Sequence, residues 1–112
     1  SRTALFSTAV IPEGIAITSA VYAEFLFGLM NVSENKRKSA MEEIELYRIL
    51  DFDKMAAQKF SKLKYDLEKS GNVIPLFDII NASIALSHGS ILVTNDSHYK
   101  RIKELDSMII KI

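Results

Sequence analysis

The stretch Ile91-Leu92-Val93-Thr94-Asn95-Asp96 decides the fold. Residues 91–94 are apolar or β-branched at every position, without the alternation that marks a strand with one solvated face. Such a strand is typical of a parallel sheet that helices cover on both faces. Polar side chains that carry out chemistry gather at the carboxyl ends of such strands. Asn95 and Asp96 stand at that edge, so a functional site is expected there.

The rest of the chain alternates short apolar runs with longer helical patterns. The runs predict strands at residues 15–18, 47–51 and 108–112. Helices are predicted at residues 20–30, 36–46 and 100–105, between Asp53 and Gly71, and between Asp78 and Gly89. Residues 2–10 predict the end of a further helix, and the expected N-caps are Ser19 and Asp53. This alternation predicts one α/β domain over residues 1–112, a three-layer α/β/α sandwich around a central parallel sheet.

Composition and charge exclude some classes of protein. Hydrophobic residues make up 48% of the 112 residues and charged residues 25%, which is ordinary for a folded domain and argues against disorder. The formal net charge is zero, so a nucleic-acid partner would need a local basic patch. Cysteine is absent from the sequence, which excludes disulfides and thiolate metal sites in it. No apolar run reaches membrane-spanning length, so we expect a soluble, cytoplasmic protein.

Three acidic residues are expected near the carboxyl edge of the sheet. Asp96 follows the strand at 91–94, and Asp78 starts the helix before that strand. Glu24 lies in the first turns of the helix after the strand at 15–18. Carboxylates that lie close together repel, and a hard divalent cation such as Mg²⁺ or Mn²⁺ relieves the repulsion. Such a site activates water and stabilises charge on a phosphate under attack.

Each acid also has an ordinary structural interpretation, which the sequence leaves open. Asp78 fits the N-cap of its helix, and Asp96 fits a turn residue. Glu24 stands in a segment that is apolar nearly all round, so its carboxylate is expected to be at least partly buried. A buried carboxylate needs a partner, and a structural salt bridge would serve as well as a metal ion.

The histidines and basic residues carry weaker indications. His88 stands before a helix-stopping glycine, where the helix dipole favours it. His98 is close enough to Asp96 to contact a substrate, although an exposed loop histidine is the simpler interpretation. Histidine pairs at helical spacing are absent from the sequence, which argues against a zinc hydrolase. Lys100 and Arg101 follow Asp96 closely and would attract the phosphates of a nucleic-acid backbone.

Three segments of the chain resemble the acid-bearing segments of PIN domains. They are AEFLFG at residues 23–28, DIINASIA at residues 78–85, and ILVTND at residues 91–96 followed by HYKRI at residues 98–102. Their order, spacing and flanking apolar pattern are similar to those of PIN-domain ribonucleases of the VapC toxin type. The resemblance extends from about residue 15 to the end of the chain, and its last segment is the most specific.

The resemblance implies a metal-dependent endoribonuclease that hydrolyses RNA phosphodiester bonds. The catalytic acids, which would hold Mg²⁺ or Mn²⁺ directly or through water, would be Glu24, Asp78 and Asp96. The residues that would support these acids are Asn81, Thr94 and Asn95, and those that would contact the RNA are Lys100 and Arg101. For Asn81, one helical turn after Asp78, a purely structural amide is equally open.

The same resemblance implies partners and leaves several functions open. A VapC-type toxin would bind a cognate antitoxin and form a homodimer. With the same site, the protein could instead be a PIN nuclease of RNA maturation. A third interpretation is an inactive PIN-like binding module, in which the acids are caps and salt-bridge partners. A response-regulator-like or other doubly wound domain is the fourth.

One segment of the family pattern has no counterpart in the sequence. PIN domains place their first acid at the end of an N-terminal strand, which lies at the centre of the sheet between the strands matching residues 15–18 and 91–94. Without it we expect a split sheet, with unpaired strand edges and exposed apolar surface. The segment would lie upstream of Ser1, come from a second copy, or be absent. Its absence would leave a three-acid site that binds metal poorly.

Overall fold

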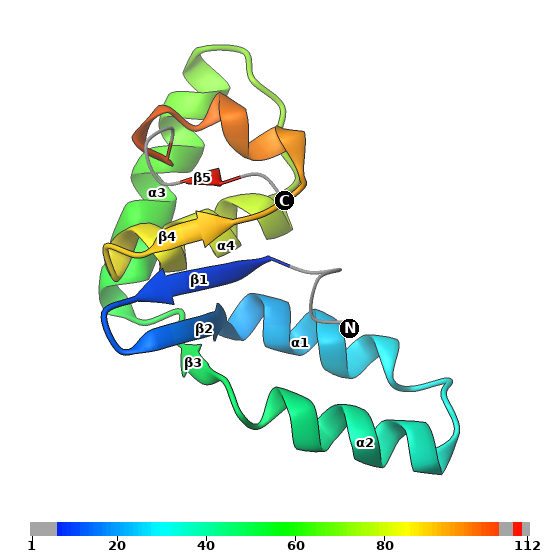
Figure 1. Ribbon diagram of the computed structural model, residues 1–112. Coiled ribbons are helices and arrows are strands. Elements are labelled where there is room, and N and C mark those ends of the chain that lie inside the picture. The colour runs from blue at the N-terminus through cyan, green and yellow to red at the C-terminus, as the bar shows by residue number, and fades with distance from the viewer. Residues whose placement is uncertain (1–6, 106–108, 111–112) are drawn as a thin grey trace.

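The structure is a computed structural model that describes residues 7–105 and the backbone of residues 109 and 110. It contains a five-stranded sheet in the order β3-β2-β1-β4-β5 (Figure 1). The strands are β1 (Thr8–Ile11), β2 (Gly14–Thr18), β3 (Arg48–Leu50), β4 (Ile91–Val93) and β5 (Ile109–Ile110). β2 pairs with β3 and β4 with β5 in parallel, while β1 runs antiparallel to β2 and β4. The α/β prediction is confirmed, with a mixed sheet in which β2, β3, β4 and β5 share one direction.

The central strand β1 takes the place of a helix predicted over residues 2–10. That prediction is wrong for residues 8–10, and residues 1–6 lie outside the described part of the chain. Thr8, Val10 and Ile11 are β-branched, and Ala9 and Ile11 face the core. Without β1, the facing edges of β2 and β4 would be left with unpaired backbone groups, and β1 pairs with both. The expected split of the sheet is therefore also wrong.

The helices are α1 (Ser19–Gly28), α2 (Glu34–Ile44), α3 (Lys54–Lys69) and α4 (Leu76–Ser87), followed by the 3-10 helices η2 (Ser97–Arg101) and η3 (Lys103–Leu105). Asp53 caps α3 as predicted, because its carboxylate accepts the Ala56 N–H. Thr18, and not the predicted Ser19, caps α1 by accepting the Val21 N–H. Two 3-10 helices replace the single helix predicted over residues 100–105.

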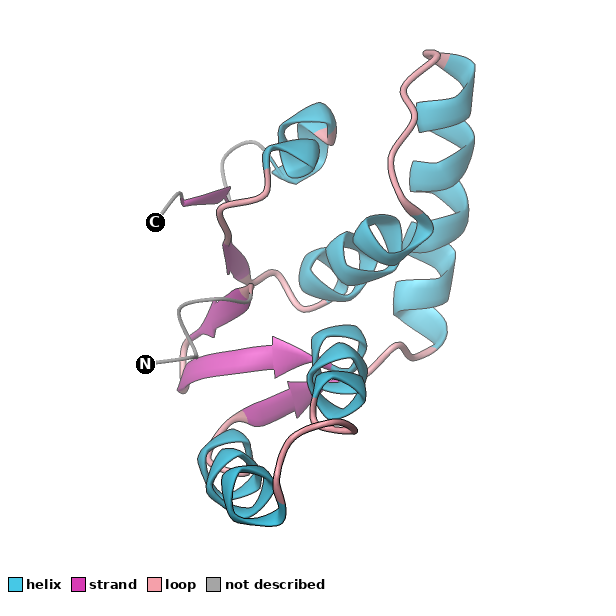
Figure 2. Ribbon diagram, turned by 90° about the vertical axis from the view of Figure 1, so that its right-hand side faces the viewer, coloured by secondary structure: helices cyan, strands magenta, loops and turns pink. Residues whose placement is uncertain are grey.

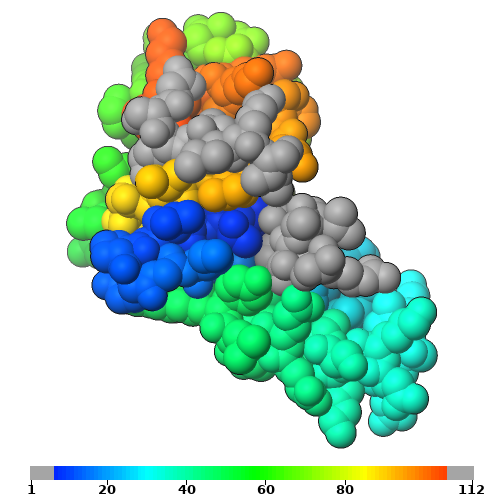
Figure 3. Space-filling view, in the orientation of Figure 1, coloured from blue at the N-terminus to red at the C-terminus, as the bar shows by residue number. Residues whose placement is uncertain are grey.

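α1, α3 and α4 lie on one side of the sheet, whereas α2 lies beyond its β3 edge (Figure 2). The main core lies between α3, α4 and β4 and includes Leu63 and Leu92. A second cluster joins β1 and β2 to α4 through Ala9, Ala16 and Ile84. α1 and α2 extend away from this core, and α2 projects from the body of the molecule in the space-filling view (Figure 3). In the described part of the chain, no helix has the length and apolarity needed to cross a membrane.

An apolar row is exposed on the face of the sheet away from α3 and α4. Val10 pairs with Ile15 on β2 and with Ile91 on β4, so the three side chains lie side by side on one face. Their exposed fractions are 37%, 56% and 38%, respectively. For Ile91 this corrects the expectation of a strand covered on both faces.

Candidate metal centre at the carboxyl edge

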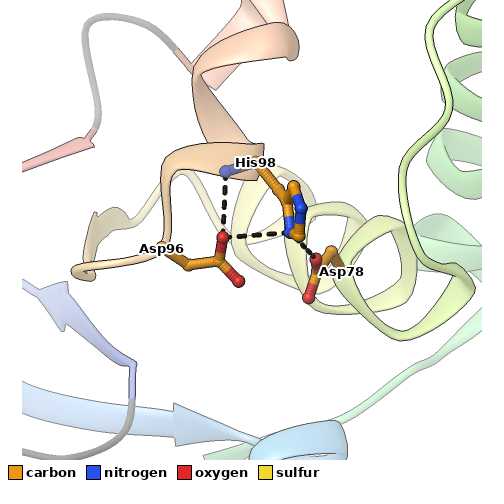
Figure 4. A group of neighbouring side chains, drawn as sticks. All are labelled: Asp78, Asp96 and His98. Atoms are coloured by element: carbon orange, nitrogen blue, oxygen red, sulfur yellow. Dashed lines mark hydrogen bonds and ion pairs between the residues drawn. The ribbon is translucent and has the colours of Figure 1, made fainter.

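Asp78, Asp96 and His98 meet at the carboxyl edge of the sheet (Figure 4). Nδ1 of His98 lies 3.1 Å from Oδ2 of Asp78 and 3.1 Å from Oδ1 of Asp96. One ligand atom from each residue lies within 4.8 Å of the others. Asp78 comes from α4, whereas Asp96 and His98 come from the segment that leaves β4. The fold therefore brings two of the predicted acids together and adds an imidazole.

Asp78 stands in the first turn of α4 and faces the site instead of capping the helix. α4 begins two residues earlier, and its N-cap, Pro75, makes no side-chain hydrogen bond, so the N-cap interpretation of Asp78 is wrong. Burial raises the pKa of Asp78 above its usual range, and the negative charge of Asp96 raises it further. The hydrogen bonds that Asp78 makes with His98 and Tyr99 oppose this rise. A nearby cation would therefore stabilise the ionised Asp78 carboxylate.

Asp96 is held by backbone contacts on both sides. Its carboxylate accepts the His98 N–H at 2.9 Å and so caps η2. Its own N–H donates to the buried Oγ1 of Thr94 at 3.0 Å, and this oxygen also accepts the Ser7 hydroxyl. Asp96 is therefore a turn residue and a member of the cluster at once. Thr94 makes the kind of contact expected of a supporting residue, while the role of the exposed Asn95 stays a prediction.

A buried hydrogen-bond network holds Asp78 on the side of the core. The Thr18 hydroxyl donates to Oδ1 of Asn81, whose Nδ2 donates to the Tyr99 hydroxyl at 2.9 Å. The Tyr99 hydroxyl donates in turn to Oδ1 of Asp78 at 3.4 Å. Thr18, Asn81 and Tyr99 are buried, and burial raises the pKa of Tyr99, so the phenol stays protonated. Asn81 thus reaches Asp78 through Tyr99 and not by direct contact.

The three donor groups fit a divalent cation. Carboxylates supply the oxygen ligands that Mg²⁺ and Mn²⁺ prefer, and imidazole is a common ligand of transition metals. The electrostatics agree, because burial and Asp96 both disfavour ionised Asp78 and a cation between the two carboxylates would favour it. The residues that could hold such an ion are Asp78, Asp96 and His98.

Glu24, the third predicted acid, does not join this group. Its side chain is exposed, contrary to the expected burial, because α1 extends beyond the sheet and buries Val21 instead. Glu24 lines a cavity of about 560 Å³ between α1 and α2, together with Phe25 and Leu29. A catalytic role for Glu24 would therefore act through water or on the substrate.

Lys100 and Arg101 follow the cluster on η2, and both are exposed. The Arg101 guanidinium donates to the backbone carbonyl oxygen of Val73 at 2.8 Å, in the connection between α3 and α4. This contact fixes the Arg101 guanidinium against the connection between α3 and α4. Binding of RNA by either residue stays a prediction.

Two residues of the network, Thr18 and Tyr99, escaped the sequence interpretation, which considered His98 only as a possible substrate contact or a loop residue. The interpretation of His98 as an exposed loop histidine is incomplete, since its ring faces both carboxylates. The spacing of Asp96 and His98 held a signal, because an aspartate that caps a turn accepts the N–H two positions later and brings that residue close. Thr18 and Tyr99 carried no local signal, since their shared partner Asn81 is 63 and 18 residues away.

Comparisons with known proteins agree on a family. The family model described as PIN domain matches residues 2–105. Ribonuclease VapC2 of Rickettsia felis is 33% identical over 94 residues, which cover 81% of this chain and 70% of the relative. Ribonuclease VapC1 of the same organism is 32% identical over 100 residues, covering 84% and 75%.

Solved structures of VapBC proteins have the same fold. VapBC2 from Rickettsia felis, bound to a DNA fragment from its promoter, contains a chain that matches with a TM-score of 0.77 and 28% identity, over 87% of this chain and 74% of that chain. VapBC-5 from Mycobacterium tuberculosis matches with a TM-score of 0.72 over 92% and 84%, and at 24% identity it supports the fold alone. The chain therefore belongs to the PIN-domain family, among its VapC-type members.

Proposed function

We propose that the protein is a metal-dependent endoribonuclease and the toxin of a toxin–antitoxin pair. The observation that carries the proposal is the buried Asp78 carboxylate beside Asp96 at the carboxyl edge of the sheet. A carboxylate buried next to another is energetically unfavourable unless a cation compensates the two charges, and such pairs are typical of functional sites. Support comes from the similar proteins of Rickettsia felis, which are named ribonucleases.

Each site residue would have a separate role in phosphodiester hydrolysis. Asp78 and Asp96 would hold Mg²⁺ or Mn²⁺, and the bound ion would lower the pKa of water and stabilise negative charge on the phosphate. Tyr99 and the η2 backbone keep the two carboxylates in place. Lys100 and Arg101 would bind flanking phosphates. Water adds to phosphorus in line, the P–O3′ bond breaks, and a 3′-hydroxyl and a 5′-phosphate result.

The cavity between α1 and α2 is the proposed antitoxin site. Phe25, Leu29, Val32 and Ala40 give it apolar walls, and charged residues including Lys36 stand among them. An amphipathic segment fits such a groove, because its apolar face replaces water while its polar face stays solvated. The similar VapBC structures are of toxin–antitoxin systems, which supports an antitoxin as the partner. A homodimer and a cytoplasmic location complete the proposal.

Removal of divalent metal is the test of the proposed activity. The full-length protein should cleave RNA in Mn²⁺ or Mg²⁺, lose all cleavage in excess EDTA, and regain it when Mn²⁺ is restored in excess. Cleavage would be followed on structured and unstructured RNAs by gel electrophoresis with end mapping. Cleavage that persists in EDTA, or products with a 2′,3′-cyclic end, would contradict the proposal. Absence of cleavage from every RNA would leave the inactive binding module.

Glu24 is proposed to assist through water, so its loss should matter less than that of a direct ligand. Glu24→Gln is expected to slow cleavage by about 10- to 100-fold, as for groups just outside the inner ligands. The matched control is Glu42→Gln on the exposed surface of α2, which should cleave like the parent. Equal cleavage rates for Glu24→Gln and the parent would mean that Glu24 has no catalytic role and only lines the α1–α2 cavity.

A further inference from the structure

We propose that Nδ1 of His98 is a direct nitrogen ligand of the metal ion, completing a three-donor face with Asp78 and Asp96. This assignment rests on the proposed metal-dependent function and adds to the acids a ligand that the sequence interpretation did not contain. If one ligand is an imidazole, the site should bind Mn²⁺ more tightly than Mg²⁺.

The spacing of the donor atoms is the first argument. A six-coordinate ion with bonds of about 2.0–2.1 Å holds neighbouring ligands about 2.8–3.0 Å apart, the edge of an octahedron. Nδ1 of His98 lies 3.1 Å from one oxygen of Asp78 and 3.1 Å from one oxygen of Asp96. Both carboxylates thus meet the same nitrogen at a distance close to that between two ligands of one ion, which is also the distance of a hydrogen bond.

The rigidity of the imidazole position is the second argument. The His98 N–H donates to the Asp96 carboxylate at 2.9 Å, so the two ligands are fixed relative to each other by a turn. The next residue, Tyr99, is 2% exposed and anchors η2 in the core. The His98 ring points towards Asp78 (Figure 4). Its side chain is 42% exposed, which leaves the site open to water and substrate.

A competing interpretation makes the opposite prediction. A protonated His98 could neutralise the two carboxylates and occupy the place of a metal ion. In that case loss of the imidazole would leave metal affinity unchanged or raise it, because a competing positive charge disappears. A ligand lost from the metal lowers affinity instead. The sign of the change in affinity separates the two.

The experiment measures metal binding without RNA. Mn²⁺ is titrated into the full-length parent, His98→Ala and His88→Ala, and free Mn²⁺ is read by electron paramagnetic resonance. His88 is the matched control, since it is the other histidine of the chain and is exposed at the end of α4. We expect His98→Ala to weaken Mn²⁺ binding by about 10-fold or more and His88→Ala to leave it unchanged. Mg²⁺, measured by competition, should lose less affinity, because it prefers oxygen ligands.

A spectroscopic measurement on the parent protein tests the assignment even if His98→Ala fails to fold. Pulsed electron paramagnetic resonance of the parent with bound Mn²⁺ should show coupling to ¹⁴N. Labelling the histidines with ¹⁵N should convert this coupling to that of ¹⁵N, in the parent and in His88→Ala alike. Circular dichroism and thermal unfolding of His98→Ala check the fold. A parent that binds Mn²⁺ without histidine nitrogen coupling, or a folded His98→Ala that binds Mn²⁺ equally or more tightly, overturns the assignment.

Failure of this assignment and failure of the proposed function give different results. RNA cleavage with Mn²⁺ bound through oxygen ligands alone would contradict the His98 assignment and support the proposed ribonuclease function. Histidine nitrogen coupling in a protein that cleaves no RNA would support the His98 assignment and contradict the proposed ribonuclease function.

Discussion

Asp78→Asn is expected to reduce RNA cleavage by about 10³-fold or more, equivalent to about 4 kcal/mol of transition-state stabilisation. The substitution keeps the shape of the side chain and an oxygen that accepts from Tyr99. It removes the negative charge that would hold a divalent cation beside Asp96. The measurement is the initial rate of cleavage at saturating Mn²⁺. Asp66→Asn, a carboxylate paired with Lys62 on the exposed surface of α3, is the control and should keep the parent rate.

The same variant should become more stable at neutral pH, which a structural role for Asp78 does not predict. Because burial and Asp96 raise the pKa of Asp78 in the folded protein, the ionised carboxylate destabilises the fold. That cost exists above the folded pKa and vanishes as the pH falls through about 4, the usual range of a carboxyl group. Asp78→Asn should therefore raise Tm at pH 7 in metal-free buffer and leave it nearly unchanged at pH 3–4. Retained cleavage together with a lower Tm would contradict the proposed role.

Asn81→Ala is expected to lower the free energy of unfolding by about 2–3 kcal/mol. Asn81 is 0% exposed, and both ends of its amide are hydrogen-bonded, to Thr18 and to Tyr99. Its removal deprives two buried hydroxyl groups of a partner and leaves a small cavity. For a domain of this size, the loss corresponds to a Tm about 10 °C lower. Thermal and urea unfolding measure the effect, and Asn31→Ala in the exposed turn after α1 is the control.

Activity separates the supporting role of Asn81 from a purely structural amide. If Asn81 positions Asp78 through Tyr99, Asn81→Ala should also slow cleavage at a temperature well below its Tm. The variant Tyr99→Phe, which removes the last hydroxyl of the network and keeps the ring in the core, should slow cleavage in the same direction. A destabilised Asn81→Ala with the parent rate at low temperature would mean that the amide is structural alone.

Local patterns predicted much of the fold correctly. The strand at β4, the helices around it and the cap of α3 at Asp53 follow from runs of apolar residues and from single capping residues, which act within a few positions of the chain. The boundary predictions differ by a few residues, as for α2, which begins at Glu34 and not at Lys36. The predicted strand over residues 108–112 is described at residues 109 and 110, and its other residues lie outside the described part.

Local patterns were enough to predict the α/β class and the positions of Asp78 and Asp96 at one edge of the sheet, because the order of these strands and helices follows from local periodicity. Tertiary structure alone decided that residues 8–11 form the central strand, since their backbone finds its partners on β2 and β4. It also decided that His98 meets Asp78, 20 residues away, and that Glu24 stays exposed. These outcomes depend on which surfaces the packed elements cover, and covering brings together residues that no local pattern connects.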